Sequence, residues 1–184
     1  MREPDNPANR FDEGKILTMS TAATLITFDE FLQMREAEGE KLELVEGEVI
    51  SMPPPVLEHS DISVRILRFL TERIGWSRVR PDATGYRIGE SCLIPDISVP
   101  FESQARDEKT FLRAPMIAIE ILSPHEETES KISIYLHGGA CEVWIVNPKL
   151  KMLVVYTAEA RIEVTGEYRS AAISQTITLT DIFG

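Results

Sequence analysis

The sequence predicts an α/β (α+β) fold in which helices flank one central mixed β-sheet. Segments with the apolar spacing of amphipathic helices interleave with short strand-like runs along the chain. Two of these runs, residues 94–99 and 116–122, are rich in Ile and next to a proline, which is typical of strands buried on both faces of a sheet. The 184 residues are enough for one domain with a single well-filled core.

The first half of the chain predicts a tail, a helix, a hairpin and a second helix. Residues 1–18 are polar and without period, so we expect a disordered tail before a single domain over residues 19–184. Thr27 and Glu30 have the spacing of a capping box, which predicts a helix from there to about Gly39. Apolar and acidic residues alternate over residues 42–50 in the manner of a hairpin. Apolar residues then recur at helical spacing over residues 57–74.

The second half predicts strands separated by one further helix. We expect two short strands at residues 77–80 and 86–88, and then the two buried strands, which are joined by a polar loop over residues 102–113. A helix is expected from residue 123 to the glycine pair at 138–139. The remaining segments predicted as strands are residues 141–146, 151–157, 161–165 and 173–179.

Composition restricts the class of protein. No apolar run approaches the roughly 20 residues that cross a bilayer, and the first residues lack the apolar core of a signal peptide, so we expect a cytoplasmic protein without membrane contact. The formal net charge of −11 argues against a general affinity for nucleic acid. Residues 65–87 nevertheless carry six arginines against two acids, for which a solvated helix face is the simplest interpretation. Cys92 and Cys141 form no CxxC pattern and are expected to be free thiols.

Asp96 and Glu120 are the candidates for chemistry, because each interrupts an apolar run that predicts a buried strand. A buried carboxylate costs several kcal/mol unless a cation or hydrogen-bond donors meet it. If the strands pair, two carboxylates about 4 Å apart repel by about 4 kcal/mol, and a shared divalent cation reverses this repulsion. Hard oxygen ligands suit Mg²⁺ or Mn²⁺. The alternative is that Asp96 caps a turn, Glu120 pairs with an arginine and Lys131 is a surface residue.

Three further side chains are candidates for the same site. Lys131 lies on the helix that follows Glu120, from where its ammonium can reach back to orient an attacking water. Glu43 is a candidate for an extra metal or water ligand, or for a partner of an arginine. His59, in the first turn of the second helix, is either a proton carrier or phosphate contact, or a structural residue bonded to backbone. The sequence contains no P-loop, nucleophile elbow, dinucleotide-binding glycine motif or HExxH helix.

The order of several motifs resembles the Uma-two family of restriction endonucleases, a branch of the PD-(D/E)XK superfamily. The motifs are LELVEGEVISMPPP, a His four residues after the last proline, IPDISV, APMIAIEILSP, a K...Y pair and GGACEVWIVNP, and together they cover most of the chain. The resemblance implies a restriction-endonuclease-like fold, a metal-dependent phosphodiesterase site and often a homodimer. It assigns the PD aspartate to Asp96, the second acid to Glu120, the lysine to Lys131 and the upstream acid to Glu43.

The sequence departs from the superfamily pattern at Leu122, where a lysine is expected two residues after Glu120. An ammonium on a long side chain can reach the same point from the next helix, so Lys131 is the expected replacement. The resulting prediction is a Mg²⁺-dependent endonuclease that hydrolyses DNA and leaves a 5′-phosphate and a 3′-hydroxyl. The acidic composition and the displaced lysine favour the alternative, a catalytically inactive protein of the same fold that acts as a binding or assembly module.

Overall fold

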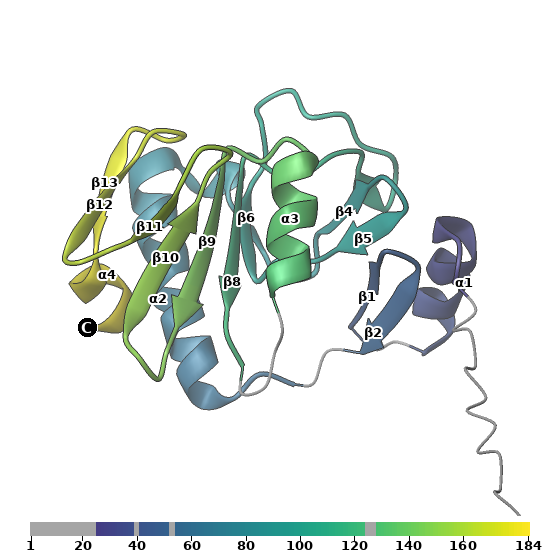
Figure 1. Cartoon of the computed structure of the whole chain (residues 1–184), viewed down its shortest axis with the longest axis horizontal. Helices are drawn as coiled ribbons and strands as arrows, with labels where there is room; N and C mark the ends of the chain where they lie inside the picture. The colour runs from purple at the N-terminus through teal and green to yellow at the C-terminus, as the bar shows by residue number, and fades with distance from the viewer. Residues whose placement is uncertain (1–24, 39–40, 52–53, 124–127) are drawn as a thin grey trace, which may run out of the picture.

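The computed structural model describes residues 25–38, 41–51, 54–123 and 128–184, and the expected tail lies outside them (Figure 1). The described part contains four α-helices: α1 (Phe28–Glu38), α2 (Leu57–Ile74), α3 (Glu129–His137) and α4 (Leu179–Phe183). None of these helices is long and apolar enough to cross a membrane.

A six-stranded mixed sheet forms the centre of the fold. Its strand order is β11-β10-β9-β8-β6-β3, in which β8 and β9 run parallel and the other neighbours run antiparallel. The strands are β3 (Arg80–Pro81), β6 (Ile97–Val99), β8 (Ile117–Ile121), β9 (Glu142–Asn147), β10 (Met152–Tyr156) and β11 (Arg161–Glu163). The predicted fold class, a mixed sheet flanked by helices, is therefore confirmed.

Two smaller sheets complete the architecture. The first has five strands in the order β2-β1-β5-β4-β7 and lies beside the central sheet in Figure 1. Its strands are β1 (Leu42–Val45), β2 (Glu48–Ser51), β4 (Gly85–Ile88), β5 (Ser91–Leu93) and β7 (Thr110–Phe111). The second is the hairpin of β12 (Glu167–Ser170) and β13 (Gln175–Thr178).

Local sequence signals account for several element boundaries. The Thr27 hydroxyl and backbone exchange hydrogen bonds with Glu30, which is the expected capping box at the start of α1. Glu46 and Gly47 both have positive φ, 50° and 89°, as a tight turn between antiparallel strands requires. The helix predicted over residues 57–74 is α2 without change.

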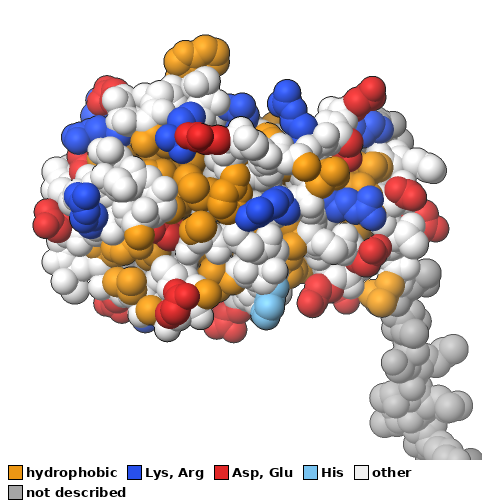
Figure 2. Space-filling model, turned by 90° about the horizontal axis from the view of Figure 1, so that it is seen from above, with side chains coloured by type: hydrophobic (Ala, Val, Ile, Leu, Met, Phe, Trp, Pro, Cys, Tyr) orange, Lys and Arg blue, Asp and Glu red, His pale blue; other side chains and the backbone are white. Residues whose placement is uncertain are grey.

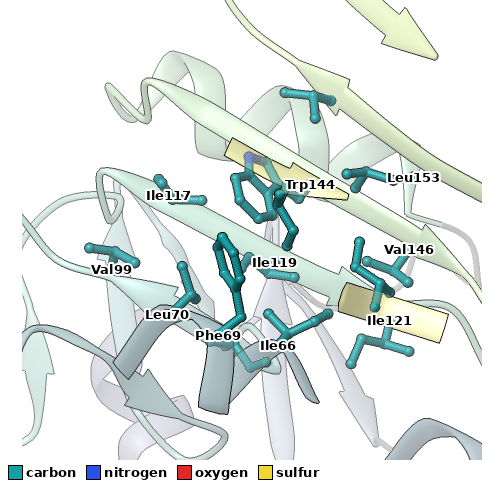
Figure 3. Close-up of a cluster of buried hydrophobic side chains, with 14 of the residues drawn as sticks. Ile66, Phe69, Leu70, Val99, Ile117, Ile119, Ile121, Trp144, Val146 and Leu153 are labelled. Atoms are coloured by element: carbon teal, nitrogen blue, oxygen red, sulfur yellow. The ribbon is translucent and has the colours of Figure 1, made fainter. Parts of the chain in front are cut away.

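The larger core fills the space between one face of the central sheet and α2. Ile66, Phe69 and Leu70 of α2 pack against isoleucines of β8 and against Trp144, as Figure 3 shows. The other face of the sheet buries Ala118, Val143 and Ile145 against α3. Because both faces are covered, β8 and β9 need apolar residues at nearly every position, which explains why Glu120 and Glu142 are the acids in otherwise hydrophobic strands.

Two predicted strands differ from the observed ones. Residues 94–96 lie between β5 and β6 and carry the chain from the five-stranded sheet to the central sheet, so the expected strand at 94–99 is only Ile97–Val99. Trp76–Arg78 form a 3₁₀ turn in place of the start of a strand at 77–80. The cause is Gly75, whose φ of 90° turns the chain sharply after α2.

The predicted C-terminal strand is shorter than expected and is not an exposed hydrophobic edge. Its ordered part is β13, which pairs with β12, and α4 follows it behind a capping box of Thr178 and Asp181. Ile173 and Ile177 are buried in the larger core of the same chain. The hydrophobic side chains of this segment therefore stabilise the monomer, and the expected homodimer stays a prediction.

Glu142 joins the C-terminal hairpin to the central sheet by hydrogen bonds. Its buried carboxylate accepts hydrogen bonds from Trp144 Nε1, Ser170 Oγ and the Ala172 N–H, at 2.8, 3.0 and 3.2 Å. Glu142→Ala leaves these donors without an acceptor, so we expect it to lower the free energy of unfolding by about 3 kcal/mol in urea denaturation. The exposed Glu167→Ala is the control; equal stability of the two variants would contradict the assignment.

Candidate active site

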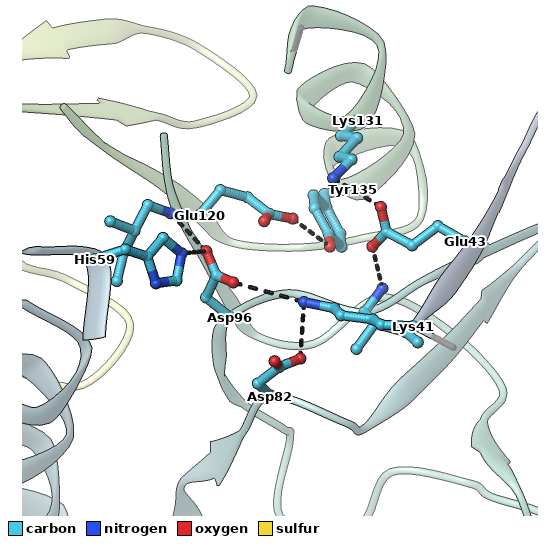
Figure 4. Close-up of polar contacts among 10 residues, drawn as sticks. Lys41, Glu43, His59, Asp82, Asp96, Glu120, Lys131 and Tyr135 are labelled. Carbon is cyan, nitrogen blue, oxygen red and sulfur yellow. Dashed lines mark hydrogen bonds and ion pairs between the residues drawn. The ribbon is translucent and has the colours of Figure 1, made fainter. Parts of the chain in front are cut away.

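Asp96, the residue immediately before β6, lies near Glu120 of the neighbouring strand β8. Ile97 pairs with Ile119 and Ser98 with Ala118, so continuing the antiparallel register by one residue sets Asp96 against Glu120. Residues directly opposite in an antiparallel pair project their side chains to the same face, with Cβ atoms about 5 Å apart. The Ile121 N–H also donates to Asp96 Oδ2 at 2.8 Å (Figure 4). The two strands therefore bring both carboxylates to one place.

Asp96 is held between a histidine and a lysine. His59 Nε2 lies 3.1 Å from Asp96 Oδ2, and Lys41 Nζ lies 3.6 Å from Asp96 Oδ1 (Figure 4). Burial opposes ionisation of this carboxyl, but the His59 hydrogen bond and charge, the Ile121 N–H and the Lys41 charge outweigh it. The pKa of Asp96 is therefore lowered, and the group is a carboxylate.

Lys41 joins Asp96 to a second acid nearer the surface. Its ammonium lies 2.8 Å from Asp82 Oδ1, and the Asp82 side chain is 48% exposed. Burial disfavours the charged form of Lys41, but the hydrogen bond to Asp82 and the charge of Asp96 are stronger. The pKa of Lys41 is consequently raised, and the lysine stays an ammonium.

Glu43 and Lys131 form a buried ion pair. Lys131 Nζ lies 2.7 Å from Glu43 Oε2, and the two side chains are 3% and 0% exposed. Glu43 Oε1 accepts a hydrogen bond from the Ile94 N–H at 2.6 Å, two residues before Asp96. The partner of Glu43 is thus a lysine and not the arginine considered from the sequence, and Lys131 is not a surface residue.

Glu120 is the most deeply perturbed acid of the group. The Tyr135 hydroxyl on α3 donates to Glu120 Oε1 at 2.8 Å. Burial raises the pKa of Glu120 well above its usual range; Lys131 acts against this, while the charges of Asp96 and Glu43 add to it. Burial, followed by the charge of Glu120, also raises the pKa of Tyr135, so the tyrosine remains a donor.

Acidic side chains outnumber lysines in the cluster. Asp82, Asp96, Glu120 and Glu43 face the two ammonium groups of Lys41 and Lys131, and the raised pKa of Glu120 favours its neutral form. Within the described ranges no group of three or more His, Cys, Asp and Glu side chains is arranged to hold a metal ion. Two carboxylates with water are nevertheless a common donor set for Mg²⁺.

Comparison with known proteins identifies the family of this chain. The family model of Uma2, described as "Putative restriction endonuclease", matches residues 28–183. The chain belongs to the Uma2 family. This is the Uma-two resemblance that the sequence motifs indicate, and it extends to the C-terminal helix.

One protein sequence and one crystal structure are similar to this Uma2 chain. An uncharacterized protein of Synechocystis sp. (strain PCC 6803) is 28% identical over 148 residues, which cover 74% of this chain and 71% of the relative. A crystal structure from Anabaena variabilis ATCC 29413, described as "a putative nuclease belonging to DUF820", has a TM-score of 0.76 and 27% identity. It covers 86% of this chain, and this chain covers 97% of it. The fold of this Uma2 chain is therefore that of a structure described as a nuclease.

The residues selected from the sequence all lie in this one cluster: Glu43, His59, Asp96, Glu120 and Lys131. The sequence analysis did not select Lys41, Asp82 or Tyr135. Lys41 is two residues before Glu43, and side chains at this spacing on a strand share a face. Tyr135 is four residues after Lys131, the spacing of one helix face. Asp82 carries no such signal, because its position depends on the turn between β3 and β4.

The buried Glu43–Lys131 pair generates a prediction about stability. Lys131→Met leaves the Glu43 carboxylate buried without its cation, and we expect the free energy of unfolding to fall by about 3 kcal/mol. Adding Glu43→Gln keeps an acceptor for the Ile94 N–H and removes the charge, so the double variant should recover a large part of this loss. Urea denaturation of the wild type, Lys131→Met, Glu43→Gln and the double variant measures the coupling energy, and additive effects would contradict a paired role.

Proposed function

We propose that this Uma2 chain is a divalent-metal-dependent endonuclease that hydrolyses DNA phosphodiester bonds. The observation that supports it is the closeness of Asp96 and Glu120: the register of β6 and β8, continued by one residue, sets them opposite each other, and the Ile121 N–H donates to Asp96 Oδ2. The Lys41 ammonium lies in the same cluster and is partly exposed, so it can meet the anionic substrate. The family match and the nuclease-like neighbour support the same reaction class.

The donor set suits a hard divalent cation. Asp96 and Glu120 are the residues that would hold Mg²⁺ or Mn²⁺, because both supply carboxylate oxygens from adjacent strand positions. A bound divalent ion polarises a phosphoryl oxygen and lowers the pKa of water, which is the chemistry that phosphodiester hydrolysis requires.

The surrounding side chains fix the orientation of both acids. Asp96 Oδ2 is held by His59 and by the Ile121 N–H, while Oδ1 is turned toward Lys41. Glu120 is held through one oxygen by Tyr135. His59 is thus placed to position Asp96, which differs from the proton carrier or direct phosphate contact considered from the sequence. Such positioning keeps the ligand oxygens in place before the substrate arrives.

Lys41 is better placed than Lys131 to meet the substrate. The Lys41 side chain is 25% exposed and lies between Asp96 and the more exposed Asp82. The Lys131 side chain is 3% exposed and is engaged with Glu43. We therefore assign the contact with a phosphoryl oxygen to Lys41, and to Lys131 the neutralisation of the buried acids. An ammonium aimed at charge that develops during the reaction stabilises the transition state.

A second function has an observation in its favour. Lys41 and His59 contact Asp96, Lys131 contacts Glu43 and Tyr135 contacts Glu120, so each of these buried acids has a partner within the chain. A catalytically inactive binding module of the same fold would also keep buried acids that are each paired within the chain. Metal binding and DNA cutting distinguish the two functions.

Replacing either proposed metal ligand should abolish cutting. We expect Asp96→Asn and Glu120→Gln to lower Mg²⁺- or Mn²⁺-dependent cutting of supercoiled DNA by at least about 100-fold, and to remove the Mn²⁺ binding that titration calorimetry detects. Asp61→Asn, at an exposed position of α2, is the matched control and should retain both. Wild-type protein that neither cuts nor binds Mn²⁺ would support the inactive module.

The assignment of Lys41 gives a separate prediction. Lys41→Met should lower the cutting rate by about 100-fold, because it removes a cation aimed at the reacting phosphate, and it should leave the melting temperature nearly unchanged. Lys41→Arg keeps the charge and should restore part of the rate. Lys149→Met, at an exposed turn, is the control. A cutting rate of Lys41→Met equal to that of the control would remove Lys41 from the mechanism.

A further inference from the structure

A hollow of about 430 Å³ lies between the turn after β3 and the loop that leads into β7. Arg80, Arg106 and Lys109 are among the residues that line it, and we call it the Arg80 hollow. An adjoining hollow of about 500 Å³ shares Arg80 and Arg106 and adds Arg78. Cationic side chains from two separate segments thus converge on one concave surface.

The loop that carries Arg106 and Lys109 is held in place by its own hydrogen bonds. Asp107 Oδ1 accepts from the backbone N–H groups of Lys109 and Thr110, at 2.7 and 2.6 Å. The carboxylate of Asp107, although it lines the hollow, is therefore engaged with backbone. The Asp107 N–H bonds to the Thr110 carbonyl at 3.0 Å and closes the turn. The two cations are presented by a fixed turn.

Aromatic stacking ties this loop to the strand that begins after Asp96. Phe111 stacks on Tyr86 with ring centroids 5.2 Å apart and an angle of 14°. The Tyr86 hydroxyl is 2.8 Å from Ser98 Oγ on β6. The position of the loop relative to the acids is consequently set by buried contacts.

Strand register places Arg80 on the same face as the acids. Arg80 pairs with Ser98 across β3 and β6, and Ser98 is two residues from Asp96. Alternation along β6 and pairing across it therefore direct all three side chains to one face. Two residues of a strand span about 7 Å. Neighbouring phosphates on one DNA strand are about as far apart, because the backbone winds around the helix axis as it rises by 3.4 Å per nucleotide.

Four other arginines of residues 65–87 have partners of their own, and among them Arg78 lies 3.7 Å from Glu102 at the edge of the adjoining hollow. Arg87 lies over the Phe28 ring at 4.2 Å, Arg73 lies over Phe69 at 5.4 Å, and Arg68 pairs with Glu72. Figure 2 likewise shows Lys and Arg side chains spread over one face of the molecule among hydrophobic and acidic ones. Among the described residues, the hydrogen bonds of Arg80 engage only Nη1, with the carbonyls of Ser77 and Val79.

We propose that the Arg80 hollow binds a backbone phosphate of the substrate DNA, one or two nucleotides from the bond that is cut. The proposal rests on the proposed nuclease function for the orientation of the DNA. It explains how a chain with a net charge of −11 can bind a polyanion, because the three cations of the hollow outnumber its two acids, Asp107 and Glu108, and Asp107 is engaged with backbone. Arg80, Arg106 and Lys109 supply the donors to the phosphate oxygens.

The test measures DNA binding without cutting. Asp96→Asn protein is titrated into a fluorescent 20-bp DNA duplex in EDTA at several salt concentrations, and anisotropy gives the dissociation constant. We expect Arg106→Gln with Lys109→Gln to weaken binding about tenfold and to reduce the slope of log affinity against log salt by one to two. Arg80→Gln should act in the same direction.

The charge-matched control is Lys149→Gln with Arg169→Gln, at exposed positions outside the hollow. Melting temperatures equal to that of the parent establish that both double variants are folded. If the two double variants share one affinity and one salt slope, or if the parent protein does not bind the duplex, the proposal is wrong. Weakened binding in a protein that never cuts DNA would reject the nuclease function and retain the phosphate site.

Discussion

The structure depends on the burial of several carboxylates at one point where three elements meet. Asp96 and Glu120 come from adjacent strands, and Glu43 comes from a strand of the second sheet. Like charges held this close in a low-dielectric interior repel strongly unless cations and donors are built around them. The partners of these acids therefore come from separate elements: the Lys131 ammonium from α3 and the His59 ring from α2. The site therefore forms only when these strands and helices pack together.

Most of the fold follows from patterns within single segments. The capping box at Thr27, the helical period over residues 57–74 and the apolar run around Glu120 each determine a local structure that the molecule keeps. The positions at which strands begin and end are less predictable, because they depend on which sheet a segment joins. Residues 94–96 are apolar enough to continue a strand, yet they cross from one sheet to the other. The residues that they contact, such as Glu43 and Ile121, lie far away in the sequence, so local patterns do not reveal this crossing.

The residues of the candidate site also fall into two groups, those that the sequence reveals and those that only the folded chain reveals. Asp96 and Glu120 could be selected from the sequence because an acid within a buried strand is unusual, and the motif order of the family supplied Glu43 and Lys131. Lys41, Asp82 and Tyr135, which complete the contacts of these acids, could not be selected in this way. Lys41 precedes a hairpin and resembles any solvated lysine, and only the folded chain sets it between two carboxylates. Contacts across elements carry this information, and local sequence does not.

The position of Leu122 explains why the ammonium groups come from other elements. Leu122 is two residues after Glu120, and its side chain packs against the core beneath α3. A lysine there would place its stem in this apolar cluster, whereas leucine stabilises the contact between sheet and helix. The cations instead reach the acids from α3 and from the residue before β1, in two environments. One ammonium is enclosed with Glu43 and balances buried charge, while the other lies near the surface, where an anionic substrate can reach it. A single lysine on the strand could not occupy both environments.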